Sequence, residues 1–216
     1  RGFITRAQGL QRLQTMVGFL QNKAQRFKGA FPHWLNGTTG AVVPFSANDN
    51  GADLVETSFM AMGLLTAREY FNNADGQETT LRNNINTLLR QIEWSWFRRN
   101  NANVLYWHWS PSVEWAMNLP ISGWNECLIT YVIAATSTTH SIPAEVYSKG
   151  FARDGSMKNG KSFFGRQLPL GEDYGGPLFL SHYSFLGINP NGLSDTYANY
   201  QTQVAAHSII NWEYCK

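Results

Sequence analysis

Phe59-Met60-Ala61-Met62-Gly63-Leu64-Leu65 is the stretch that decides our interpretation of the fold. In a helix expected over residues 52–71, it would be apolar on every side, which is typical of a helix packed all round. Two later stretches are similar: residues 128–135, in a helix expected to begin near Gly123, and residues 177–185. The sequence therefore predicts three inner helices, each enclosed by neighbours.

Other segments carry only one apolar stripe and would lie outside these inner helices. Thr5 and Gln8 form a capping-box pattern that opens a helix to about Phe27, with apolar residues three and four apart. Residues 77–96 and residues 194–214, the latter capped by Ser194 and Asp195, show the same pattern, and a short helix is expected from Pro143. This alternation predicts an all-α ring of helical hairpins, with a plain helical bundle as the alternative.

The predicted loops also alternate in length. Connections into the inner helices are long (29–51, 98–121 and 151–176), and those leaving them are short (72–76, 137–142 and 186–194). An Asn36-Gly37 turn predicts a hairpin within the first long loop. All long loops would then meet at the N-terminal ends of the inner helices. Long loops in compact domains usually carry function, so a site is expected at that end.

The composition excludes several classes of protein. A net charge of +2 with interspersed charges gives no reason to expect a nucleic-acid partner, and no apolar run is long enough to span a membrane. The two cysteines and five histidines show no metal-ligand spacing, so we expect neither a metal nor another cofactor. Aromatic residues reach 14% and charged residues only 15%, which indicates one core-rich domain over residues 1–216 with aromatic side chains available for binding.

Carboxylates provide the chemistry that the sequence supports. Ser122 is interpreted as an N-cap, which places Glu126 in the first turn of an apolar helix beside Trp124. That environment raises the pKa of an acid toward the range of a general acid, although acidic residues also simply favour helix N-termini. Asp53 and Glu56, three residues apart, are expected to share one helix face, with Asp49 just before it. Paired carboxylates indicate cleavage of a glycosidic bond.

Aromatic and polar side chains are expected around these acids. The segment from Leu105 to Pro111 alternates like a strand, which would turn Tyr106 and His108 to one side. We interpret His33 and His108 as packing residues rather than metal ligands, with His108 also near the substrate. Flat aromatic faces beside carboxylates suit a carbohydrate. The candidate substrate-binding residues are Asp49, Trp34, Trp107, His108, Trp109, Trp124, Asn125 and Tyr174.

Five motifs in order along the chain resemble the bacterial glucoamylase-like family. They are Ala52-Asp53-Leu54-Val55-Glu56-Thr57, Tyr106-Trp107-His108-Trp109-Ser110-Pro111, Gly123-Trp124-Asn125-Glu126-Cys127-Leu128-Ile129-Thr130-Tyr131, Asp173-Tyr174-Gly175-Gly176-Pro177-Leu178-Phe179 and His182-Tyr183-Ser184-Phe185-Leu186-Gly187. The family is an (α/α)6 toroid, and its members are similar to endo-β-1,2-glucanases of glycoside hydrolase family 144. The resemblance implies an inverting hydrolase of linear β-1,2-glucan. Glu126 would be the general acid, and Asp49, Asp53 and Glu56 would shape the cleavage site.

Six hairpins need about twelve helices, whereas this sequence predicts seven, or about half to two-thirds of a ring. We therefore expect an internal piece of a longer protein, with the general base outside residues 1–216. Two alternatives stay open: a transglycosylase-type domain of a cyclic β-1,2-glucan synthase, and a non-catalytic glycan-binding module. The resemblance also implies a periplasmic or exported protein, and we expect a monomer.

Overall fold

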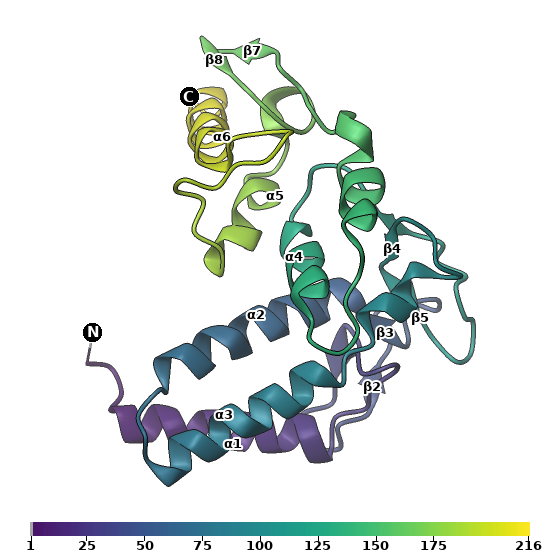
Figure 1. The fold of residues 1–216 in the computed structure, drawn as a ribbon, viewed down its shortest axis with the longest axis vertical. Coiled ribbons are helices and arrows are strands. Elements are labelled where there is room, and N and C mark those ends of the chain that lie inside the picture. The colour runs from purple at the N-terminus through teal and green to yellow at the C-terminus, as the bar shows by residue number, and fades with distance from the viewer. Residues whose placement is uncertain (1) are drawn as a thin grey trace. The chain divides into compact units, whose positions relative to one another are not determined.

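The computed structural model describes residues 2–216, and its regular elements are helices joined by two-residue strands (Figure 1). The α-helices are α1 (Arg6–Asn22), α2 (Leu54–Tyr70), α3 (Gly76–Arg90), α4 (Leu128–Thr136), α5 (Phe179–His182) and α6 (Tyr200–Tyr214). Shorter helical turns are η1 (Trp94–Arg98), η2 (Val146–Phe151), η3 (Arg153–Gly155), η4 (Asp173–Gly175) and η5 (Tyr183–Leu186). The chain forms two compact units: residues 2–97, Trp107–Leu119 and Ser137–Ser141 form the first, and Arg98–Tyr106, Pro120–Thr136 and Ile142–Lys216 form the second.

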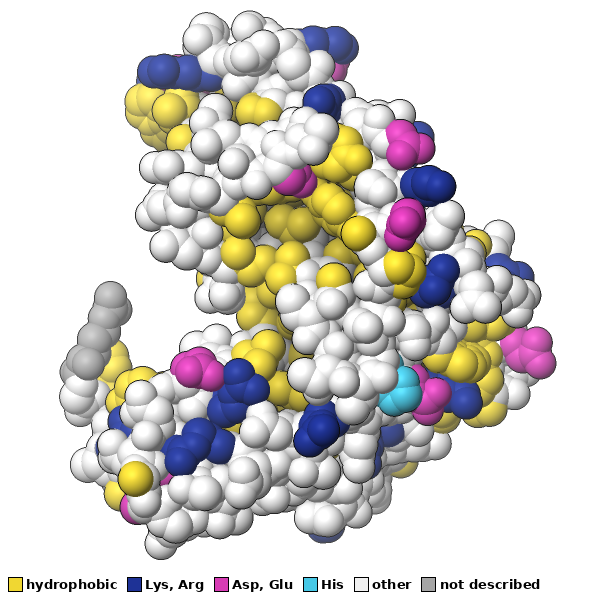
Figure 2. Space-filling model, in the orientation of Figure 1, with side chains coloured by type: hydrophobic (Ala, Val, Ile, Leu, Met, Phe, Trp, Pro, Cys, Tyr) yellow, Lys and Arg dark blue, Asp and Glu magenta, His cyan; other side chains and the backbone are white. Residues whose placement is uncertain are grey.

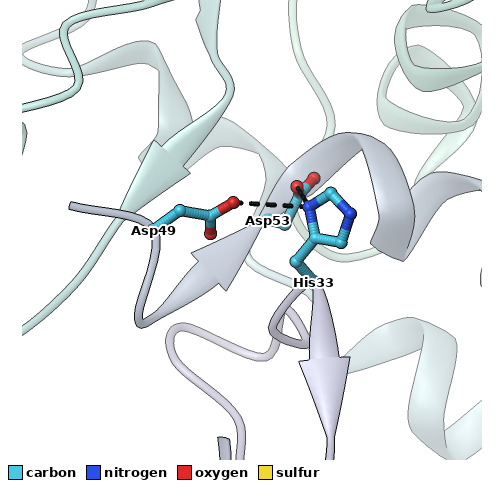
Figure 3. A group of neighbouring side chains, drawn as sticks. All are labelled: His33, Asp49 and Asp53. Carbon is cyan, nitrogen blue, oxygen red and sulfur yellow. Dashed lines mark ion pairs between the residues drawn. The ribbon is translucent and has the colours of Figure 1, made fainter. Parts of the chain in front are cut away.

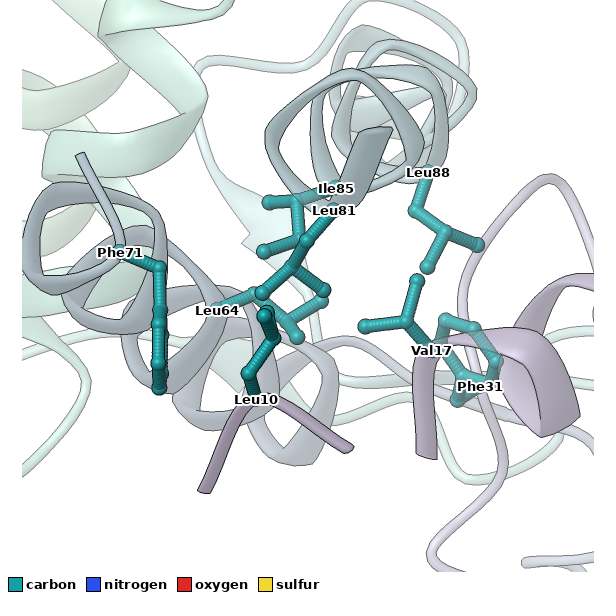
Figure 4. Close-up of a cluster of buried hydrophobic side chains, with 8 residues drawn as sticks. All are labelled: Leu10, Val17, Phe31, Leu64, Phe71, Leu81, Ile85 and Leu88. Atoms are coloured by element: carbon teal, nitrogen blue, oxygen red, sulfur yellow. The ribbon is translucent and has the colours of Figure 1, made fainter. Parts of the chain in front are cut away.

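Three helices, α1, α2 and α3, build the core of the first unit (Figure 4). The stripe predicted for residues 77–96 supplies Leu81, Ile85 and Leu88, which are at most 1% exposed, and Ile92 is also buried. The core side chains shown are Leu10, Val17, Phe31, Leu64, Phe71, Leu81, Ile85 and Leu88. Burial of one such side chain contributes about 1.5–3 kcal/mol, so this cluster holds the three helices together.

The second unit packs α5 against α6 and η5, while α4 lies against η2 and η5. Tyr131 of α4 is 1% exposed, and its hydroxyl accepts from the Leu105 N–H and donates to the Ile121 carbonyl. A buried phenol needs such partners, and here they tie α4 to two strands. Helix η2 is a π-helix, so the short helix expected from Pro143 is present in a wider, underwound form.

Four antiparallel strand pairs pin the loops. They are β1 (Trp34–Leu35) with β2 (Val42–Val43), β3 (Ala52–Asp53) with β5 (His108–Trp109), β4 (Leu105–Tyr106) with β6 (Pro120–Ile121), and β7 (Ser162–Phe163) with β8 (Arg166–Gln167). The hairpin predicted around Asn36-Gly37 is confirmed, with a longer turn: Asn36 Oδ1 accepts from the N–H groups of Thr38 and Thr39. Strands β4 and β5 pair with different strands, so residues 105–111 do not form one alternating strand.

Two helix ends differ from the prediction. Helix α1 has the expected capping box at Thr5 but ends at Asn22, because the N–H groups of Gln25 and Phe27 instead donate to loop carbonyls. Helix α6 begins at Tyr200 with Asn199 as its N-cap, not at Ser194-Asp195. Asp195 Oδ1 accepts from the N–H groups of Tyr197 and Ala198 in a turn before the helix, and its Oδ2 accepts from the side chains of Tyr147 and Tyr200.

The prediction that Ser122 caps the helix carrying Glu126 is also wrong. Helix α4 begins at Leu128, and the Ser122 hydroxyl donates to the Gly150 carbonyl. Glu126 lies in the turn before the helix. The N-terminal halves of α2 and α4 are buried on most sides as expected, while Gly63 and Val132 are exposed within the chain.

Charged side chains of both signs are interspersed on the face drawn in Figure 2, and no single-sign patch covers either unit there. This distribution agrees with the small net charge of +2. No helix within residues 2–216 combines the length and the apolarity that crossing a membrane requires. The all-α class with helical hairpins is confirmed.

Candidate active site

Two carboxylates and two imidazoles meet in the first unit. His33 Nδ1 lies 3.3 Å from Asp49 Oδ2 and 3.1 Å from Asp53 Oδ2 (Figure 3). His108 Nε2 lies 3.5 Å from the same two oxygens. Asp49, Asp53 and His108 are buried, and His33 is partly exposed. We call these four residues the carboxylate–imidazole cluster.

Local structure explains why the cluster forms. Asp53 is the N-cap of α2: its Oδ1 accepts from the N–H groups of Val55 and Glu56, which leaves Oδ2 to face the histidines. The Asp53 N–H donates to the Phe31 carbonyl, which brings the His33 segment alongside. Pairing of β3 with β5 sets Asp53 opposite His108. Gly51 permits this approach, because a Cβ there would lie 2.4 Å from the Trp109 carbonyl.

The cluster is electrostatically strained. Burial raises the pKa of Asp49, and the neighbouring Asp53 carboxylate raises it further, while His108 and His33 lower it. In the described part of the chain, the buried side-chain atoms without a hydrogen-bond partner are His33 Nδ1, Asp49 Oδ1, Asp53 Oδ2 and His108 Nδ1. All of them belong to this cluster. Since buried polar atoms are normally paired, the cluster has unused capacity to bind something.

Glu126 lies in the second unit, in a turn held by side chains on either side. The Asn125 side chain accepts from the Cys127 N–H, and the Ser184 hydroxyl donates to the Glu126 carbonyl at 2.6 Å. Ser184 Oγ also accepts from the Ile129 N–H at 3.0 Å. The Glu126 side chain is partly exposed. The turn therefore fixes the backbone of Glu126 while leaving its carboxyl group accessible.

A second set of hydrogen bonds, which we call the Ser181 network, supports the same turn. The Trp124 indole N–H and the Gln203 amide both donate to Ser181 Oγ at 3.1 Å, and His207 Nδ1 lies 2.7 Å from it. Burial lowers the pKa of His207, so a neutral imidazole occupies this place. Gly175 packs so closely on the ring that a Cβ would lie 2.3 Å from His207 Nε2. Residues 173–176 are thereby tied to Trp124.

The predicted aromatic residues divide into exposed and packed ones. Trp34 is 51% exposed and Tyr174 is 46% exposed, so each presents a ring to solvent. Trp107 stacks on His108, and Trp109 packs edge-on against Trp96. Trp124 is buried, stacked on Tyr200 with its N–H bonded to Ser181, and therefore occupies a packing position.

The structure brings together only some of the predicted site residues. Asp49, Asp53 and His108 meet in the first unit, joined by His33, which we had interpreted as a packing residue. Asp53 is the N-cap of α2 rather than a residue of the helix, and its carboxylate accepts from the Glu56 N–H. Glu126, Asn125, Trp124 and Tyr174 lie in the second unit. His33 reaches the cluster because the Asp53 N–H donates to the Phe31 carbonyl. That contact joins residues too far apart in the sequence for a short motif to reveal it.

Comparison with known proteins matches the whole chain to β-1,2-glucan hydrolases. It is 42% identical to the exo β-1,2-glucooligosaccharide sophorohydrolase of Parabacteroides distasonis, covering 100% of this chain and 32% of that protein. The structure of an endo-β-1,2-glucanase from Chitinophaga pinensis superposes with a TM-score of 0.96 at 54% identity, over 100% of this chain and 52% of that one. The structure of a β-1,2-glucanase from Parabacteroides distasonis superposes with a TM-score of 0.94 at 41% identity, over 99% of this chain and 33% of that one.

These relatives are longer: the chain spans about half of the solved endo-glucanase and about a third of the sophorohydrolase. The model of the family described as "Putative glucoamylase" matches residues 118–216, which contain the Glu126 and Tyr174 motifs. The motifs in the first unit are covered by the alignments to the solved relatives. The resemblance of this chain to the bacterial glucoamylase-like family is therefore confirmed.

Proposed function

We propose that the protein is a glycoside hydrolase that cleaves internal bonds of linear β-1,2-glucan. The observation that carries the proposal is the 54% identity, over the entire chain, to an enzyme named as an endo-β-1,2-glucanase. The partly exposed Glu126 carboxyl group and the buried carboxylates around Asp53 supply the residue types that glycosidic cleavage needs.

Glu126 is the general acid in this proposal. An acid that protonates a leaving oxygen must be held at one place, because small displacements lower the rate sharply. The hydrogen bonds of Ser184 and Asn125 to the backbone of this turn provide that restraint. Asp53, Glu56 and Asp49 would shape the cleavage site, and Trp34 and Tyr174 would offer rings for stacking against glucose units. We further propose an inverting reaction, with the base outside these residues.

A second candidate is exo-hydrolysis, which releases sophorose from chain ends. It is favoured by the 42% identity to a sophorohydrolase over the full length of this chain. The alternatives of a cyclic-glucan transglycosylase domain and a glycan-binding module predict other products, or none. The proposal is thus separable from each of them by product analysis.

The test is release of new reducing ends from linear glucans of β-1,2, β-1,3, β-1,4 and β-1,6 linkage. We expect release from β-1,2-glucan alone, as a ladder of oligosaccharides with inverted anomeric configuration. Glu126→Gln should lower the rate by about 10²–10⁴-fold, as expected for loss of a general acid. The matched control Glu145→Gln, which alters an exposed glutamate, should retain the rate.

Other products would contradict parts of the proposal. Sophorose as the sole early product would establish the exo reaction, and cyclic products would establish transglycosylation. Saturable quenching of Trp fluorescence by the glucan, without release of reducing ends, would indicate a binding module. If the chain neither releases reducing ends nor binds any of the glucans, a carbohydrate function for this chain is refuted.

A further inference from the structure

The carboxylate–imidazole cluster holds two carboxylates close together in a buried place. Asp49 and Asp53 are 4% and 0% exposed, and the Oδ2 oxygen of each lies within 3.5 Å of a nitrogen of His33 and of His108. Two carboxylates this close and this buried are costly unless a cation or a proton lies between them. Either histidine is a possible source of a proton. The geometry of the cluster must therefore decide between a shared proton and a bound cation.

Hydrogen-bond geometry argues against direct pairing within the cluster. His33 Nδ1 is within 3.3 Å of two carboxylate oxygens, yet it makes no hydrogen bond, and neither does Asp53 Oδ2. These atoms therefore lie close to one another without forming a hydrogen bond. Figure 3 shows the His33 ring facing both carboxylates, with an ion pair marked to each. That arrangement is typical of ligand atoms around a common centre.

The spacing of these atoms fits a metal ion. A tetrahedral cation with bonds of about 2.0–2.1 Å separates its ligand atoms by about 3.3 Å. The four nitrogen–oxygen separations in the cluster are 3.1, 3.3, 3.5 and 3.5 Å. His33, Asp49 and Asp53 each offer one atom, and these atoms lie within 4.8 Å of one another. These four nitrogen–oxygen edges lie within a few tenths of an ångström of that separation, and His108 stands outside the three-residue group as a fourth neighbour of the two carboxylates.

We propose that His33, Asp49, Asp53 and His108 bind one divalent transition-metal cation, with Zn²⁺ as the best match. The ligand atoms would be His33 Nδ1, Asp49 Oδ2, Asp53 Oδ2 and His108 Nε2. Two imidazole nitrogens favour zinc over magnesium and calcium, which prefer oxygen ligands alone. Two carboxylates would balance the charge of the ion.

Such an ion would connect three segments that are distant in sequence: the loop before β1, the loop and cap that lead into α2, and strand β5. Asp53 would then be a ligand through Oδ2 and a helix cap through Oδ1. The site goes beyond the proposed function and does not depend on it, because it is measurable without a glucan.

The experiment is metal analysis of the purified protein after loading with ZnCl₂ and exhaustive dialysis. We expect one retained equivalent of Zn²⁺ and a higher thermal unfolding midpoint than in EDTA. Asp49→Asn and His33→Gln should each weaken Zn²⁺ binding by at least about 100-fold, since even loss of a supporting residue costs 10–100-fold. The matched controls are Asp75→Asn, the N-cap of α3, and His140→Gln, and both should retain the ion.

Cobalt gives an independent readout on the wild-type chain, which does not depend on whether a variant folds. Co²⁺ should produce the intense visible absorption of a tetrahedral nitrogen–oxygen site, and Zn²⁺ should abolish it. Zn²⁺ retained equally by the two ligand variants would mean adventitious surface binding and would overturn the proposal. No retention by the wild type would also overturn it, and the cluster would then be held by a protonated histidine.

Discussion

The two units treat buried polar groups in opposite ways. In the first unit, the carboxylate–imidazole cluster leaves buried nitrogen and oxygen atoms without hydrogen bonds. In the second, Ser181 Oγ alone contacts the side chains of Trp124, Gln203 and His207, and a neighbouring carboxylate, Asp195, accepts from Tyr147 and Tyr200. The first arrangement is charged and incomplete, whereas the second is largely neutral and complete.

This difference indicates that the polar groups of the first unit serve to bind a ligand and those of the second unit serve to hold the backbone in place. A buried group that lacks a partner costs about 1–3 kcal/mol, so it persists where a ligand supplies what is missing. A saturated network of neutral donors and acceptors has no capacity for a ligand but holds its backbone in place. We therefore assign ligand binding to the first unit's cluster and alignment of the Glu126 turn to the second unit's network.

Of the substitutions that test this difference between the units, removal of the Ser181 hydroxyl should change stability most. Ser181→Ala would leave the Trp124 N–H, the Gln203 amide and His207 Nδ1 without their shared partner in a buried site. We expect the free energy of unfolding to fall by about 2–4 kcal/mol, which urea denaturation followed by circular dichroism would measure. Ser148→Ala, a serine outside this network, should change it by less than about 0.5 kcal/mol. An equally small loss for Ser181→Ala would mean that the network is not saturated.

Features set by local sequence were predicted well. The stripe Leu81, Ile85, Leu88 and Ile92 forms a buried face because three- and four-residue spacing alone places it on one side of a helix. The Thr5 capping box is likewise local. Helix ends were predicted less well. Asp195 does accept from the N–H groups two and three residues later, as an N-cap would, but no helix follows directly and α6 begins only at Tyr200.

The candidate site likewise has a part that local sequence predicts and a part that depends on long-range contacts. Asp49 and Asp53 stood out because, with Glu56, they place three carboxylates around one predicted helix start. Their joining to His33 and His108 depends on the pairing of β3 with β5 and on the bond from Asp53 to Phe31. Those contacts link segments that no short motif contains. The metal-ligand spacing is therefore visible in the structure and absent from the sequence.

Acid should weaken the second unit through Asp195. Partial burial favours the protonated carboxyl, but hydrogen bonds from Tyr147, Tyr200 and two backbone N–H groups outweigh it and hold the pKa of Asp195 below its ordinary value. Because the folded pKa is lowered, this stabilisation is present above the ordinary pKa and is lost as the pH falls through the folded value.

Unfolding measured from pH 7 down to pH 2 should therefore show a loss below about pH 4 that Asp195→Asn reduces. At neutral pH, we expect the same substitution to cost about 1 kcal/mol, because an amide accepts more weakly than a carboxylate. Asp154→Asn is the control, since Asp154 is an aspartate of the same unit outside this network. An unchanged acid limb in Asp195→Asn would show that Asp195 is not the group responsible.

Loss of a carboxylate from the first unit should change stability least, and in the absence of metal it should raise stability rather than lower it. Burial and the adjacent Asp53 raise the pKa of Asp49, so its charge is disfavoured when no cation is bound. Asp49→Asn keeps the shape and an acceptor oxygen without that charge. In EDTA at pH 7, we expect its thermal midpoint to equal or exceed that of the wild type by up to about 2 °C. With ZnCl₂, only the wild type should gain stability, which would reverse the order of the two proteins. A lower midpoint for Asp49→Asn in EDTA would mean that the carboxylate already has its partner, and the two units would then not differ in the way proposed.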